Sequence, residues 1–98
     1  METQDLIPIQ ILCNQYKIPV SFINTLQEFQ LIEIIVENEG FYIHNKQIKE
    51  VEKMIRLHYD LDINIEGVDA IYNLLKQVKS LKQEITMLHN RLRLYEDL

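Results

Sequence analysis

Residues 71–95, with the sequence IYNLLKQVKSLKQEITMLHNRLRLY, contain the pattern that decides the fold. Apolar side chains recur there at alternating steps of three and four residues, which is the spacing of a helix that pairs with another helix. The members of this seam are Ile71, Leu74, Val78, Leu81, Ile85, Leu88, Leu92 and Tyr95. We expect them to be the oligomerisation residues of one long helix over residues 65–96.

The length of this helix implies a partner for its seam. At the usual rise per residue the helix is about 48 Å long, and a small core does not cover such a rod. Leaving four seam residues in water forgoes on the order of 6–12 kcal/mol of burial. We therefore expect a homodimer through a coiled coil; packing along its own domain is the alternative. A parallel pair places Glu84 near His89 and Arg91 near Glu96, and the seam also permits an antiparallel pair.

Upstream of the seam, two short helices are separated by the tripeptide KIP at residues 17–19. Pro8 and the apolar residues after it predict a first helix over residues 8–16, with the proline in its first turn. Pro19 ends that helix, because the residue before a proline avoids the helical conformation. Apolar residues at three-residue steps from Val20 to Phe29 predict the second helix, so the pair predicts a helix-turn-helix.

A β-hairpin and a third helix complete the expected head. Isoleucine and valine between residues 31 and 37, the sequence NEG at 38–40 and FYI at 41–43 predict a wing of two short strands. The third helix opens at His44 and Asn45, with Asn45 as N-cap. Its apolar stripe is Ile48, Val51, Ile55 and Tyr59. Asn64 is expected to cap the long helix, and both glycines, Gly40 and Gly67, are interpreted as turn residues.

These elements define the fold class as mainly α. We expect a winged helix-turn-helix head with a small β-hairpin wing and a long C-terminal coiled-coil helix. The predicted head covers residues 1–63 and the heptad helix covers residues 64–98, as one structural domain.

Composition places the chain among cytoplasmic globular proteins. Its 98 residues are 47% hydrophobic and 26% charged, with no apolar run near the roughly 20 residues of a membrane span. The N-terminal sequence METQDLIPIQ has no basic region and two acids, unlike a secretory signal. Cys13 is the single cysteine, which excludes an internal disulfide and fits a reducing compartment.

The net charge of −5 is concentrated in the first half of the chain. Residues 1–45 carry Lys17 as their only base, whereas residues 46–98 carry nine bases and nine acids. The acids of the first half are Glu2, Asp5, Glu28, Glu33, Glu37 and Glu39. Residues 20–30 and 32–43, where a winged head reads DNA, have no base, so the cations that DNA binding requires are missing. We expect DNA binding to be lost, although Asn24 or Gln27 has the right chemistry for a base edge.

No enzyme or metal site is expected, and no cofactor. The alternating oxygens of Asp60, Asp62, Asn64 and Glu66 resemble a calcium loop, but its sixth position is isoleucine instead of glycine. None of the three histidines has a neighbour at metal-ligand spacing. Cys13, beside Leu12 on the first helix, is expected to be a buried structural thiol. We therefore predict no catalytic residues.

The order of elements resembles the MerR superfamily of winged helix-turn-helix regulators. Such regulators carry a basic stretch similar to RYYE late in the second helix, where this chain has NTLQ at residues 24–27. They also carry a GYRxY wing motif, where this chain has GFYIH at residues 40–44. The arginine of each motif is replaced, by Asn24 and by Tyr42. The DNA-binding residues of the family are therefore not carried over.

A further resemblance is to the chaperone-modulator branch of that superfamily, the CbpM-like proteins. It is carried by RLHYDLDINIEGV at residues 56–68, LKQE at 81–84 and RL at 91–92. This resemblance implies that the chain binds and inhibits a J-domain co-chaperone of the DnaJ/CbpA type and so denies it to the Hsp70 DnaK. An acidic head suits a basic partner surface. The expected partner-binding residues are Asn24, Glu28, Glu33, Glu37 and Glu39; the alternative is a MerR-like dimeric DNA-binding regulator.

Overall fold

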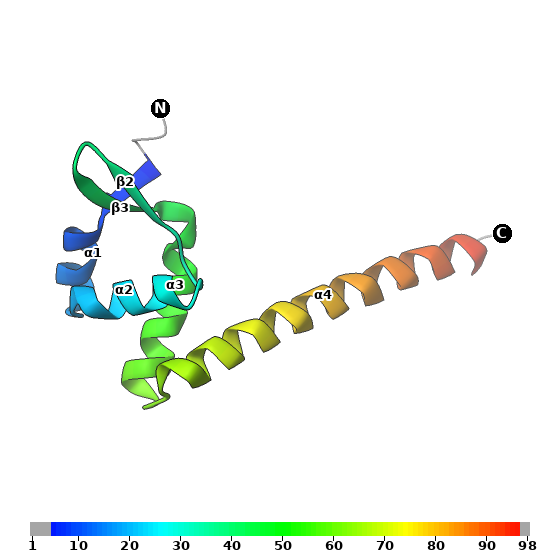
Figure 1. Cartoon of the computed structure of the whole chain (residues 1–98). Helices are drawn as coiled ribbons and strands as arrows, with labels where there is room; N and C mark the ends of the chain where they lie inside the picture. Colours follow the sequence, from blue (N-terminus) through cyan, green and yellow to red (C-terminus); the bar gives the residue numbers. More distant parts are fainter. Residues whose placement is uncertain (1–4, 97–98) are drawn as a thin grey trace.

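The chain forms a head of short elements from which one long helix projects (Figure 1). A computed structural model describes residues 5–96. The last helix, α4 (Ile65–Glu96), extends away from the head as a rod, and the molecule measures 60 × 38 × 21 Å. The predicted fold class is confirmed, together with the bounds of the long helix.

Two short helices, α1 (Ile9–Tyr16) and α2 (Val20–Glu28), form the predicted helix-turn-helix. Lys17 closes α1 in the left-handed conformation, with φ of 57°, and Pro19 precedes α2 with an extended backbone. The predicted break at residues 17–19 is therefore confirmed. The core between the two helices is made of side chains that are at most 1% exposed, namely Leu12, Ile23 and Leu26.

The wing belongs to a three-stranded antiparallel sheet with the order β1-β3-β2. The strands β2 (Ile34–Glu37) and β3 (Gly40–His44) confirm the predicted hairpin, whereas β1 (Leu6–Pro8) is a strand that the sequence did not predict. Pairing of Ile7 with Ile43 joins the segment before α1 to the wing. Pro8 ends β1 with an extended backbone, so its predicted place in the first helical turn is wrong.

A two-residue turn connects the strands of the wing. Asn38 and Glu39 both adopt left-handed φ angles, 49° and 64°, as the twist of a tight hairpin requires. The turn signal at residues 38–40 is thus confirmed, but Gly40 does not itself have a positive φ. Gly40 opens β3, and a Cβ atom there would lie 3.0 Å from the ring of Tyr42. Close approach of that ring explains the glycine.

The third helical segment is divided into three parts. A 3₁₀ turn (Asn45–Gln47) leads into α3 (Ile48–Ile55), which continues as a π-helical turn, η3 (Arg56–Asp60). The expected cap is wrong, because Nδ1 of His44 instead of Asn45 accepts from the backbone N–H of Lys46 at 3.1 Å.

The wider π turn also changes the predicted apolar stripe of this segment. Val51 and Met54 are completely buried, and Ile48 and Ile55 pack against the same core. Tyr59 is 44% exposed instead of lying on the buried stripe. Met54, which is not one of the four predicted stripe residues, takes a central position in the core.

A tight corner connects η3 to α4. The backbone N–H of Ile63 donates to Leu57 at 3.1 Å, and Nδ1 of His58 lies 2.8 Å from the carbonyl oxygen of Ile63. Asn64 caps α4 as predicted, since its Oδ1 accepts from the N–H of Gly67 at 2.8 Å. Gly67 lies within the first turn of α4, so its interpretation as a turn residue is wrong. A Cβ atom at Gly67 would lie 2.6 Å from the side chain of Ile63.

The first turns of α4 also belong to the core of the head. Val68 is completely buried, and Ile65 and Tyr72 pack against the same cluster. The predicted boundary between residues 63 and 64 therefore lies at the helix start, with the core continuing past it. Beyond Tyr72, α4 leaves the head.

Replacing Asn64 by alanine is expected to lower the free energy of unfolding by about 1 kcal/mol, because the N–H of Gly67 loses its cap. Urea unfolding followed by circular dichroism measures this loss. Asn73→Ala is the matched control, since Asn73 is an exposed residue of α4 that bonds only to Asp69 one turn earlier. Equal losses for the two variants would contradict the capping role of Asn64.

Candidate partner-binding surface

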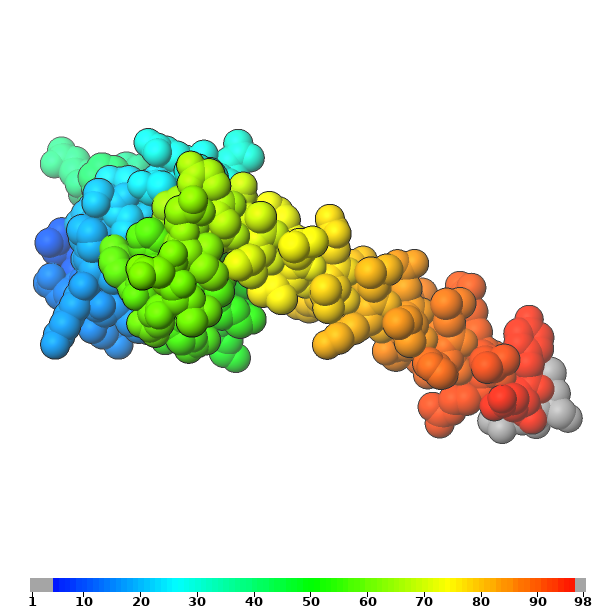
Figure 2. All heavy atoms as spheres, turned by 90° about the horizontal axis from the view of Figure 1, so that it is seen from below, coloured from blue at the N-terminus to red at the C-terminus, as the bar shows by residue number. Residues whose placement is uncertain are grey.

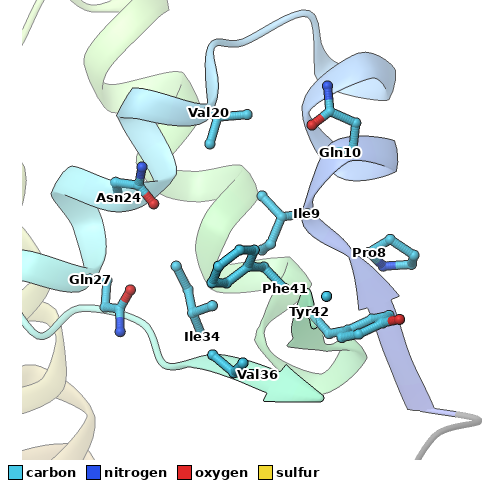
Figure 3. A pocket seen from close by; sticks show the side chains of 11 residues that line it. Pro8, Ile9, Gln10, Val20, Asn24, Gln27, Ile34, Val36, Phe41 and Tyr42 are labelled. Atoms are coloured by element: carbon cyan, nitrogen blue, oxygen red, sulfur yellow. The ribbon is translucent and has the colours of Figure 1, made fainter. Parts of the chain in front are cut away.

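The outer face of α2 and the wing enclose a groove of about 470 Å³. From α2 the groove takes Val20, Asn24 and Gln27, and from the wing it takes Ile34, Val36 and Phe41, among others. Figure 3 shows Phe41 and Ile34 in the space between α2, the β1–α1 junction and the wing. The lining contains no charged side chain.

Strand geometry explains why the wing contributes apolar side chains to this groove. Val36 and Phe41 are direct cross-strand partners, and Ile34 lies on the same face of β2 because side chains alternate along a strand. Ile43, the partner of Ile34, is completely buried, whereas Val36 and Phe41 are 64% and 60% exposed. One apolar face of the hairpin therefore begins in the core and ends in the groove.

Only one of the five predicted partner-binding residues lies in the groove, namely Asn24. Glu28 ends α2, Glu37 ends β2, and Glu39 is in the wing turn. The backbone N–H and C=O of Glu33 bond to the side chain of Gln47, both at 3.0 Å, which leaves the carboxylate outward. None of the four glutamates lines the groove. Glu28 lies one turn beyond Asn24 on α2, and Glu39 precedes the lining residue Gly40. Glu37 points from the face of β2 opposite to Val36, because side chains alternate along a strand. Within residues 5–96, none of the four glutamates forms an ion pair.

The sequence did not predict the apolar contribution to this surface. A hairpin that is open to water on one face normally carries polar residues there. The sequence signal for an apolar face was the two-residue spacing of Ile34 and Val36, together with Phe41 on the other side of the turn. Four acids and Asn24 were chosen from the sequence, because charged and polar side chains can be recognised without knowing which face of a strand is exposed to water.

The two positions at which MerR-type regulators carry arginine, 24 and 42, both line this groove. A family model described as MerR HTH family regulatory protein matches residues 7–90, which include α1–α3, the sheet and most of α4. The chain belongs to the MerR HTH family. No curated protein and no solved structure matches the chain. Family membership accounts for the helix-turn-helix and does not by itself identify a partner.

The head has an excess of negative charge. In residues 5–45 there are five acids, against Lys17 as the single base. Lys17 lies at the end of α1, outside the groove. A head that reads DNA needs cations on α2 and the wing. In this head neither α2 nor the wing has a lysine or an arginine.

The α4 seam forms a second exposed surface. Its residues from Leu74 to Tyr95 are between 43% and 74% exposed, whereas Ile71 is half-buried against the head. Figure 2 shows the rod projecting from the head, and on the face in view no other element of residues 5–96 lies along it. Three further exposed apolar side chains of α4 lie outside the predicted seam, namely Leu75, Met87 and Leu94. Such exposure is expected of a helix that pairs with another helix. The alternative, in which α4 packs along its own head, differs from the structure, because α4 projects away from the head.

The remaining reactive side chains of the head have structural roles. Burial raises the pKa of the Cys13 thiol, which keeps it in the neutral form. The hydroxyl of Tyr16 donates to Glu52, and this bond, with burial and the carboxylate charge, raises the pKa of Tyr16. Residues 5–96 bring no three metal-ligating side chains together, and none of their helices is long and apolar enough to span a bilayer.

Proposed function

We propose that this chain is a cytoplasmic chaperone modulator that binds a J-domain co-chaperone of the DnaJ/CbpA type. It inhibits the co-chaperone without catalysis, by covering the surface that the Hsp70 DnaK would use. The observation that carries this proposal is the surface of α2 and the wing, which combines an uncharged groove with acids in place of bases: Glu28 and Glu39 adjoin its lining residues along the chain. Such a surface suits a basic protein far better than a phosphate backbone.

The resemblance of residues 56–68 to CbpM-like proteins supports the same assignment. In the structure this stretch forms η3, the corner and the first turn of α4. His58 and Asn64 fix the corner through bonds to Ile63 and Gly67. In the proposed function this stretch holds the angle between head and rod, and the groove of the head contacts the partner.

We also propose that α4 joins two chains into a homodimer. The seam is apolar and exposed over its whole length beyond the head. A dimer would present two copies of the head and its groove, which increases the apparent affinity for a partner with two matching sites.

Binding to the host's own full-length J-protein tests the proposal. Isothermal titration calorimetry at low ionic strength is expected to detect a complex that weakens as salt is added, because the acids act through long-range attraction. The chain should also reduce the stimulation of DnaK ATPase by that J-protein. A null titration at low salt, with folded proteins on both sides, would reject the proposal.

A second candidate is a dimeric DNA-binding regulator, which membership of the MerR HTH family favours equally. A gel shift with fragments of the host's own promoters at low ionic strength distinguishes the two. We expect no shift, since α2 and the wing provide no base to neutralise phosphates. A robust sequence-specific shift would support the regulator and overturn the charge argument.

A further inference from the structure

The groove between α2 and the wing combines exposed apolar side chains with two acidic neighbours along the chain, Glu28 and Glu39. We infer that it receives the apolar ridge of a basic amphipathic helix of the partner, an inference that rests on the proposed function and specifies its contact. The chemistry of the partner follows from three features of the head: the exposed apolar pair, the face on which it lies, and the sign of the flanking charges.

The first feature is an apolar pair that the fold does not need. Val36 and Phe41 are more than half exposed, so their side chains contribute little to the core of the head. Together with Val20, which is 37% exposed, they give the groove an apolar surface that a partner would remove from water. Aromatic side chains in such positions provide much of the affinity of protein interfaces.

The second feature is the position of the groove on a face of the hairpin. Val36 and Phe41 point from that face, whereas the unpaired backbone groups of β2 lie along its edge. An added strand would pair along the edge and leave the groove empty. A helix, in contrast, inserts side chains at three- and four-residue steps into a groove of this kind. The amides of Asn24 and Gln27 then provide donors and acceptors for its polar flank.

The third feature is the sign of charge. Two glutamates adjoin lining residues of the groove along the chain: Glu28 lies one helical turn beyond Asn24, and Glu39 precedes Gly40. Both are exposed, and neither is paired within residues 5–96. A helix with Lys or Arg on both sides of its apolar ridge complements them. A second copy of the chain does not fit as the occupant of the groove. Its long amphipathic helix is α4, and the apolar face of α4 is used in the proposed coiled coil.

Serine variants of the groove test this inference with two probes. One probe is the host's full-length J-protein; the other is a synthetic 18-residue helical peptide of leucine and lysine, with leucine on one face. Val36→Ser and Phe41→Ser are each expected to weaken binding of both probes by roughly tenfold or more. Ile11→Ser is the matched control, because Ile11 is 56% exposed on α1 and outside the groove. Circular dichroism should show all three variants folded.

The possible outcomes separate the inference from the proposed function. If the J-protein binds the parent chain and the groove variants bind as tightly as Ile11→Ser, the groove is not the docking site, although the function stands. If the J-protein does not bind, the proposed function is rejected. Binding of the leucine–lysine peptide to the same variants then shows whether the groove is a docking site. Binding of a leucine–glutamate peptide as tight as that of the leucine–lysine peptide would overturn the basic character of the partner. Loss of binding to duplex DNA in the groove variants, with no effect on protein probes, would also overturn it.

Discussion

An Ile85→Asp chain is expected to be a monomer at concentrations where the parent chain is a dimer. Ile85 lies in the middle of the seam and is 54% exposed in a single chain, so only a partner helix can bury it. Placing a carboxylate in that interface costs on the order of several kcal/mol, because the charge loses its hydration without gaining a partner. Light scattering at several protein concentrations measures the change in mass.

The control for this experiment adds the same charge to the opposite side of the rod. Asn90→Asp lies off the seam in the heptad register and should leave the mass of the parent unchanged. A parent that is already a monomer would contradict the coiled coil. A dimer that survives Ile85→Asp would show that another surface joins the chains.

Phe22→Ala is expected to lower the free energy of unfolding by about 3–5 kcal/mol, a large part of the total for a small domain. Phe22 is 5% exposed, and its ring centroid lies 5.2 Å from those of both His58 and Tyr59. Removing the ring leaves a cavity between α2 and η3. Urea unfolding provides the measurement, with tyrosine fluorescence as the second probe.

Phe41→Ala is the matched control because it removes the same ring from a position that is 60% exposed. Its expected cost is below about 1 kcal/mol, as for other surface truncations. The two variants should therefore affect different properties: Phe22→Ala reduces stability, and Phe41→Ala reduces partner binding. Similar losses of stability would show that the groove is part of the core.

Periodic patterns made the helices predictable. The heptad spacing placed α4 at its observed bounds, and Pro19 placed the turn between α1 and α2. The strand β1 was missed because three residues carry no periodicity, and their pairing partner, β3, lies more than thirty residues away. The π turn was missed because local sequence does not reveal one extra residue per turn, and the stripe that ends in Tyr59 was consequently misplaced.

The candidate site was only half predictable. The absence of cations is a property of composition, so the sequence alone indicated a surface that does not suit DNA. The groove depends on which face of the wing turns towards α2, and that is fixed by the register that pairs Val36 with Phe41. Asn24 was selected as a polar residue near the acids of the second helix and wing, and the structure places it in the same groove as those two side chains.

The corner held by His58 and Asn64 sets the direction in which α4 leaves the head. The rod that it directs is about 48 Å long, so a change of 10° at the corner would displace the far tip by roughly 8 Å. When two rods are joined along their seams, the corner angles also determine how far apart the two heads sit and which way their grooves face. In such a dimer, the few hydrogen bonds within residues 57–67 would therefore set the distance between the two heads.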